Sequence, residues 1–196
     1  MFASEPRISP DADDRELVRA SLSGNLKAYE TLVRRYQKLV YNMLYQMTHS
    51  HEQAADLTQE AFLRAFRGLN GFRTDAPFKP WLLRIATNAC LNDLRGRKQV
   101  DSLEETLEEN PQDEPAARDN VEAEVEQRIS QQQLGEALQQ LSPRQRQVFV
   151  LRYVHDLPYE QIGQITGEPV TTIKPLLFRI RERLRNIMQK ECKSSV

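Results

Sequence analysis

The stretch that decides the fold is residues 158–185, which read PYEQIGQITGEPVTTIKPLLFRIRERLR. Tyr159 to Ile165 is a short segment with apolar residues at helical spacing, and Thr166 to Pro169 contains Gly167 and predicts a tight turn. In the longer segment that follows, apolar residues again recur at helical spacing: Ile173, Leu176, Leu177, Ile180 and Leu184. A short helix, a glycine turn and a long helix form the outline of a helix-turn-helix.

The long helix of this motif is basic on its remaining faces. These faces carry Lys174, Arg179, Arg181, Arg183 and Arg185. In a helix-turn-helix the second helix enters the major groove of DNA, where its early residues meet base edges and its later cations meet phosphates. The alternative is an ordinary basic surface helix over a helical core. The order of short helix, turn and long helix favours DNA binding.

Charge is distributed along the chain in blocks. Residues 1–98 carry 15 Lys and Arg against 11 Asp and Glu, residues 99–126 carry 1 against 11, and residues 127–196 carry 11 against 6. The formal net charge of −1 therefore hides two basic segments with an acidic segment between them. Basic segments suit a phosphate backbone, whereas the acidic segment cannot bury enough apolar surface to fold alone. We therefore predict two nucleic-acid-facing domains joined by a flexible acidic linker.

Helical periodicity extends through both basic segments, so we predict an all-α protein with two small helical domains. The predicted organisation is a disordered tail at 1–12, a first domain at 13–98, the linker at 99–126, a second domain at 127–190 and a tail at 191–196. The predicted helices start near Asp13 and then cover Leu26 to Thr48, Gln53 to Leu69, Pro80 to Arg97, Val125 to Leu141 and Pro143 to His155.

The composition argues against several other classes of protein. Cys90 and Cys192 are far apart and no membrane-spanning stretch or signal peptide is found, so we expect a cytoplasmic protein with reduced thiols and no membrane insertion. His49 and His51 have no further ligand at metal-site spacing. No phosphate-binding loop or activated nucleophile is apparent. We therefore expect no metal, no cofactor and no enzymatic activity.

Several motifs follow one another in a fixed order. Residues 56–62 read DLTQEAF, 78–88 read FKPWLLRIATN, 92–95 read NDLR, 141–146 read LSPRQR and 172–184 read TIKPLLFRIRERL. This order closely resembles bacterial sigma factors of the extracytoplasmic-function group (group 4 of the sigma-70 family), whose motifs read D-L-T-Q-E-x-F, W-L-x-R-I-A-x-N and often D-x-x-R. Asn92 stands where the last aspartate is common.

The resemblance implies RNA polymerase core as a partner, contacted at its β′ clamp helices and β flap. It assigns core binding to the polar edge and aromatic side chain of residues 56–62, namely Asp56, Gln59, Glu60 and Phe62. Acidic groups that meet a basic partner helix orient such docking. The alternative is that Asp56 and Glu60 are ordinary solvent-exposed residues.

The resemblance also implies that the predicted fourth helix recognises the promoter −10 element. Its polar stripe at three- and four-residue steps consists of Arg84, Asn88, Asn92 and Arg95, which suit base edges and phosphates. The loop at residues 70–79 is then expected to receive a base flipped out of the non-template strand. In that loop Asn70 and Arg73 are the expected bonding groups, and Phe72 and Phe78 the expected stacking groups. Simple packing is the alternative for the aromatic rings and is favoured for Trp81.

For the −35 element, the resemblance assigns the exposed polar residues of the last helix: Thr171, Thr172, Lys174, Arg179, Arg181 and Arg183. The family run T-V-K-S-R-L-F-R is changed here, because Pro175 and Leu176 replace Ser and Arg. Pro lacks an N–H and is tolerated best in the first helical turn, so we predict a helix cap at Thr172. Leu176 cannot donate a hydrogen bond. We expect a shifted or weakened −35 readout that relies on Lys174 and Arg179.

The motifs together predict a transcription initiation factor that directs RNA polymerase to promoters through their −10 and −35 elements. Family habit implies an anti-sigma factor as a further partner, and such a partner would be able to hold the protein at the membrane. The acidic linker either mimics nucleic acid in a polymerase channel or is a solvated spacer. The alternatives are a stand-alone helix-turn-helix repressor or activator, which leaves residues 56–62 and 81–97 unused, and a protein-interaction adaptor, which leaves both basic surfaces unexplained.

Overall fold

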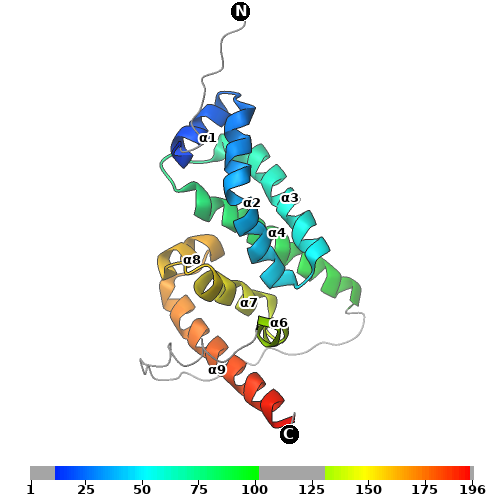
Figure 1. Cartoon of the computed structure of the whole chain (residues 1–196). Helices are drawn as coiled ribbons and strands as arrows, with labels where there is room; N and C mark the ends of the chain where they lie inside the picture. Colours follow the sequence, from blue (N-terminus) through cyan, green and yellow to red (C-terminus); the bar gives the residue numbers. More distant parts are fainter. Residues whose placement is uncertain (1–11, 102–130, 195–196) are drawn as a thin grey trace, which may run out of the picture. The chain divides into compact units, whose positions relative to one another are not determined.

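The computed structural model describes residues 12–101 and 131–194 (Figure 1). Within these residues all regular structure is helical, which confirms the predicted all-α class. The described helices fall into two groups along the sequence, and we refer to α1–α4 as the N-terminal unit and to α6–α9 as the C-terminal unit. Residues 1–11 of the predicted tail and most of the linker at 99–126 lie outside the described residues, and the predicted domain boundaries stay a prediction. No helix in the described ranges is long and apolar enough to cross a membrane.

The N-terminal unit contains α1 (Asp14–Leu22), α2 (Leu26–Thr48), α3 (His51–Gly68), a short 3-10 helix η1 (Leu69–Gly71) and α4 (Phe78–Asp101). The predicted helices are present, and the ends are set by local caps. Asn25 caps α2 through the Ala28 N–H, and Ser50 caps α3 through the Gln53 N–H. Because Ser50 is the cap, α3 begins two residues before the predicted Gln53. α4 begins at Phe78, with Pro80 in its first turn as expected.

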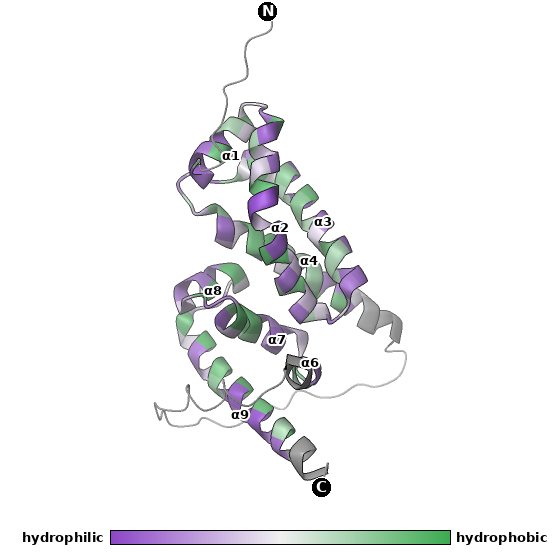
Figure 2. Ribbon diagram, viewed as in Figure 1, coloured by the Kyte–Doolittle hydropathy of each residue, from purple (hydrophilic) through white to green (hydrophobic). Residues whose placement is uncertain are grey.

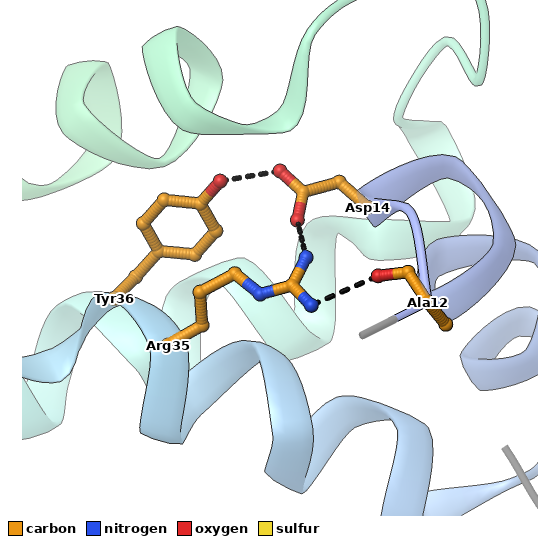
Figure 3. Close-up of polar contacts among 4 residues, drawn as sticks. All are labelled: Ala12, Asp14, Arg35 and Tyr36. Carbon is orange, nitrogen blue, oxygen red and sulfur yellow. Dashed lines mark hydrogen bonds and ion pairs between the residues drawn. The ribbon is translucent and has the colours of Figure 1, made fainter. Parts of the chain in front are cut away.

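The start of α1 is fixed to α2 by a polar network (Figure 3). Arg35 donates to Asp14 at 2.5 Å (Nη1 to Oδ1) and to the Ala12 carbonyl at 2.8 Å. The Tyr36 hydroxyl donates to the other Asp14 oxygen. Burial, together with this hydrogen bond, raises the pKa of Tyr36 above its ordinary value. These contacts hold the first turn of α1 against the middle of α2.

Each helix of the N-terminal unit buries one apolar stripe, and the polar residues face outward (Figure 2). Fully buried side chains include Leu17 of α1, Leu32 and Leu44 of α2, and Leu82 and Leu83 of α4. α2 and α3 pack along each other, as do α1 and α2. Phe66 has the three- and four-residue spacing of the buried side chains of α3, such as Phe62, which predicts a core residue, but it is 43% exposed.

The C-terminal unit contains α6 (Gln131–Gln139), α7 (Pro143–Phe149), a π-helical segment η2 (Val150–Val154), α8 (Tyr159–Thr166) and α9 (Val170–Ser194). The start predicted for α7 is confirmed: Ser142 and Gln145 form a reciprocal capping box, and Pro143 is the first helical residue. The described part of α6 lies inside the helix predicted for Val125 to Leu141.

A buried arginine joins α6 to α7. Arg146 is only 8% exposed, and its guanidinium donates to the carbonyls of Leu138 (2.8 Å), Gln139 (2.9 Å) and Leu141 (3.3 Å). The last carbonyls of a helix have no partner within the helix. Arg146 supplies such partners, so a charged side chain of α7 acts as the C-terminal cap of α6.

The turn between α8 and α9 depends on two glycines. Gly167 has φ = +77°, a left-handed conformation that glycine adopts without a steric penalty. A Cβ atom on Gly163 would lie 2.8 Å from the Glu168 carbonyl oxygen. The Glu168 side chain is in turn held by Arg144, at 2.5 Å between Nη2 and Oε1. The turn is therefore tight both because of its backbone angles and because two backbone segments touch.

The position of Pro175 corrects one prediction. α9 begins at Val170, because the Pro169 carbonyl accepts from the N–H groups of Thr172 (2.9 Å) and Ile173 (3.3 Å). The predicted cap at Thr172 is therefore wrong, and Pro175 lies in the second turn of the helix. There its missing N–H leaves the Thr171 carbonyl without the usual donor four residues later. Both residues are exposed, so water can reach this carbonyl.

Candidate nucleic-acid and partner interfaces

The polar stripe predicted on α4 forms one continuous exposed surface. Arg84, Asn88, Asn92 and Arg95 are all exposed, and their spacing of three and four residues places them along one side of the helix. The opposite side is buried through Leu82, Leu83, Ala86, Ala89 and Cys90. α4 is therefore anchored by its apolar side and presents amide and guanidinium groups, which suit base edges and phosphates, on the other.

η1 and the loop that joins it to α4 carry two further exposed polar residues. Asn70 and Arg73 are both exposed, as predicted for groups that bond a nucleotide. Arg73 is also paired within the loop, because its Nε and Nη2 donate to the Asp75 carboxylate at 3.2 and 2.7 Å. This hydrogen bond lowers the pKa of Asp75 and raises the pKa of Arg73. An anion that binds the Arg73 guanidinium must therefore compete with Asp75.

The aromatic residues of the same loop pack inward. Phe72 is 8% exposed and Phe78 only 2%. Together with Trp81 they form a cluster, with ring centroids 4.7 Å apart for Phe72–Trp81 and 5.6 Å for Phe78–Trp81. Tyr36 extends the cluster at 5.8 Å from Phe78. Both Phe rings are therefore packed in the interior in this structure, which is the alternative that the sequence left open. They anchor the two ends of the loop and are not exposed to stack on a base.

An apolar groove lies between α2 and α3. Its volume is about 780 Å³. Its walls carry unusually exposed apolar side chains: Leu26 is 66% exposed, Leu63 is 49% exposed and Phe66 is 43% exposed. Tyr29 lies at its base, edge-on to Phe66 at 4.9 Å, and donates to the Phe62 carbonyl at 2.6 Å. Burial raises the pKa of Tyr29 to about 12. Large exposed apolar residues gathered in a groove mark a protein-binding surface.

The residues predicted to bind polymerase all lie on α3, but only Gln59 and Phe62 line the groove, whereas Asp56 and Glu60 do not. Asp56 and Gln59 are exposed, and Gln59 lines the groove directly. Glu60 is half-buried and forms an ion pair with Arg64 at 2.6 Å, one turn along α3. Phe62 is 7% exposed and contributes to the groove wall.

Sequence reasoning missed three apolar residues of this groove, Leu26, Leu63 and Phe66. A signal was present for Leu63, which lies off the buried stripe of α3.

α9 carries the residues predicted for the second DNA surface, but Arg181 and Arg183 differ from the others in their exposure or contacts. Thr171, Thr172, Lys174 and Arg179 are exposed, whereas Arg181 is half-buried with its guanidinium 5.9 Å from the Phe178 ring centroid. Arg183 instead donates to the Gln140 carbonyl at 2.9 Å and so braces the α6–α7 turn. The opposite stripe is buried through Ile173, Leu177, Ile180 and Leu184, whereas Leu176, predicted to be buried, is only half-buried.

Comparisons with known proteins give matches to both groups of helices. Residues 32–100 match the family model described as Sigma-70 region 2, and residues 131–184 match Sigma-70, region 4. The chain is 35% identical over 190 residues to the RNA polymerase sigma-H factor of Pseudomonas aeruginosa, which covers 90% of this chain and 94% of that protein. It is 33% identical over 187 residues to the ECF RNA polymerase sigma-E factor of Escherichia coli K12, covering 93% and 97%.

Two solved structures share the fold. The sigma factor RpoE in complex with the anti-sigma factor NepR from Bartonella quintana gives a TM-score of 0.63 at 24% identity, covering 83% of this chain and 98% of that chain. CnrH in complex with the cytosolic domain of CnrY gives 0.67 at 22% identity, covering 90% and 97%. From the two family models and the two curated relatives it follows that the chain belongs to the extracytoplasmic-function group of the sigma-70 family of RNA polymerase sigma factors.

Proposed function

We propose that the α2–α3 groove is the surface through which this initiation factor binds RNA polymerase core. The observation that carries the proposal is the combination of exposed Leu26, Leu63 and Phe66 in the groove with the exposed polar residues Asp56 and Gln59 of α3, of which Gln59 lines the groove. An apolar groove takes the apolar side of a partner helix, and buried contacts of this kind supply most of the affinity. The Asp56 carboxylate orients a basic partner and speeds association.

Promoter contacts are assigned to the two polar helix faces. The α4 stripe of Arg84, Asn88, Asn92 and Arg95, with Asn70 and Arg73 of the loop, serves the −10 element. The exposed side of α9 serves the −35 element. Asn and Arg side chains match the donor and acceptor groups of bases, and cations match phosphates. The buried Phe72 and Phe78 support the −10 loop from below. Specific initiation requires polymerase, so DNA binding by the isolated chain is expected to be weak.

An anti-sigma factor is the proposed further partner, since the sigma factor RpoE of Bartonella quintana was solved with the anti-sigma factor NepR, and CnrH was solved with the cytosolic domain of CnrY. A protein that covers the α2–α3 groove competes with polymerase for the same apolar side chains. Such a complex places this chain in the cytoplasm, where it acts without catalysing a reaction of its own. The acidic linker lies outside the described residues, and its two proposed roles stay open.

The groove is tested by measuring the Kd of the labelled full-length chain for purified core polymerase. Leu63→Ser removes an exposed apolar side chain, and Asp56→Lys reverses an exposed charge of α3. Leu22→Ser and Glu16→Lys are matched controls, because they make the same changes on the exposed surface of α1. We expect Leu63→Ser to weaken binding about tenfold and Asp56→Lys to slow association most strongly at low salt.

Retention of a pre-melted −10 probe, with and without core, separates the candidate classes of function. Retention that needs core supports the initiation factor. Equal retention of duplex DNA without core supports the stand-alone repressor, and core binding with no effect on DNA supports the adaptor. If both groove variants bind core as tightly as the two controls, the groove is not the polymerase surface.

A further inference from the structure

The outward side of α9 carries an apolar ridge. Thr171, Pro175 and Phe178 are spaced at four and three residues, so they lie in line on one side of the helix. Thr171 and Pro175 are exposed and Phe178 is half-exposed. The ridge lies opposite the buried stripe that includes Ile173 and Leu177. It is therefore the part of the helix that projects furthest from the C-terminal unit.

Cations flank this ridge on both sides. Lys174 and Arg181 follow one edge, with the Lys174 ammonium 5.4 Å from the Tyr159 ring centroid and the Arg181 guanidinium 5.9 Å from the Phe178 ring centroid. Arg179 is exposed on the other edge. A major groove has the complementary layout, because two lines of phosphates border a floor of base edges. Charge complementarity thus selects duplex DNA as the occupant and directs the ridge at the bases.

We infer that this ridge recognises the 5-methyl groups of thymine in the −35 element, an inference that rests on the proposed function of α9. The ridge offers the threonine methyl, the proline ring and the edge of a phenyl ring. In the major groove thymine is the base that presents a methyl group, and apolar side chains contact it. Pro175 has neither an N–H nor a polar side chain with which to bond a guanine or an adenine. Pro175 therefore recognises a base by apolar contact, and the flanking cations contact phosphates and so position the helix on the DNA.

The test replaces thymine with deoxyuridine, which keeps the hydrogen-bonding groups of thymine and lacks only the 5-methyl group. Holoenzyme made from the full-length chain first selects sites from duplexes that are randomised across the −35 region. The selected duplex is then rebuilt with deoxyuridine at single thymines. We expect thymine to be selected and its replacement to weaken binding about fourfold for each methyl that the ridge buries.

Conservative variants place the effect on the ridge. Thr171→Ser keeps the hydroxyl and removes the ridge methyl. At the base that Thr171 contacts, the ratio of the affinities for thymine and deoxyuridine should therefore fall toward one. Thr31→Ser makes the same change in α2, away from α9, and should keep the full loss of affinity caused by deoxyuridine. Binding of each variant to core polymerase serves as the folding control.

Two results would overturn the inference in distinguishable ways. If deoxyuridine binds as well as thymine while Lys174→Ala and Arg179→Ala still weaken binding to the −35 duplex, α9 is engaged with DNA but does not recognise methyl groups. If neither the base change nor the cation variants alter binding, α9 does not serve the −35 element, and that part of the proposed function fails together with the inference.

Discussion

The contact between Gly163 and the Glu168 carbonyl predicts that Gly163→Ala destabilises the C-terminal unit. Alanine in place of a helical glycine normally stabilises a protein by about 0.5–1 kcal/mol. Here the new Cβ would lie 2.8 Å from the carbonyl oxygen, so the two groups must separate by about 0.6 Å to reach ordinary contact. The Glu168 side chain is held by Arg144 and its carbonyl precedes Pro169, which limits this movement. Overpacking of this kind costs about 1–3 kcal/mol.

The net expectation is a loss of about 1–2 kcal/mol, equivalent to a decrease of at least about 4 °C in the Tm of a unit of this size. Far-UV ellipticity follows both units, whereas fluorescence of Trp81, the one tryptophan in the sequence, follows the N-terminal unit. Gly163→Ala should therefore shift an ellipticity transition without moving the fluorescence transition. Because the displaced turn leads into α9, binding of the −35 duplex should also weaken.

Gly68→Ala is the matched comparison for this substitution. Gly68 is also a glycine within a helix, but a Cβ atom added there would lie 3.6 Å from the Trp81 ring, an ordinary contact. We expect Gly68→Ala to leave the stability of the N-terminal unit unchanged or to raise it. If Gly163→Ala stabilised the C-terminal unit as an ordinary helical alanine does, the proposed close contact at the turn would be refuted.

Three further substitutions test the polar contacts. Arg146→Gln should destabilise the C-terminal unit by about 2–4 kcal/mol, measured by urea unfolding, because buried carbonyls lose a charged donor. Asp75→Asn should free Arg73 and tighten binding of holoenzyme to a pre-melted −10 probe, with a salt dependence steeper by about 0.7 in log–log slope; an unchanged slope would contradict this. Asp14→Asn should destabilise the N-terminal unit by about 1–2 kcal/mol in Trp81 fluorescence, since its bond with Tyr36 loses a charged acceptor.

Helices and caps were the part of the fold that the sequence could predict. Apolar spacing placed α2 at Leu26 to Thr48, with the same bounds in the structure, and the Ser142–Pro143 pair placed the start of α7. Both signals are local, because a helix needs only its own residues to define an apolar side and a first turn. The exposed side of α4 followed for the same reason, once the buried side was known.

What the sequence could not predict depends on which neighbour covers a side chain. Phe66 has the spacing of a core residue, yet no helix covers it, and it becomes a wall of the α2–α3 groove. Phe72 and Phe78 were assigned a binding role in a loop, yet Trp81 and Tyr36 cover them. Periodicity shows that a residue is apolar on one side of a helix, but it carries no information about long-range partners.

Arg146 and Gly163 were unpredictable for a related reason. An arginine in a basic segment is usually a surface residue, and burial becomes favourable only because three carbonyls of another helix end converge on it. A glycine inside a helical pattern normally lowers the stability of the helix. Gly163 is required here because the backbone of the following turn lies too close for a Cβ atom. In both cases the partner lies in a different element.

Local and long-range interactions are also separate in α9, which explains how this helix tolerates Pro175 on its exposed side. A proline inside a helix costs up to about 3 kcal/mol when the lost hydrogen bond is buried. Pro175 lies on the side opposite Ile173, Leu177 and Ile180, so the carbonyl that loses its donor faces water and the packing of the C-terminal unit does not depend on it. The chemistry of the outward side is therefore free to change while the buried stripe keeps the helix in place.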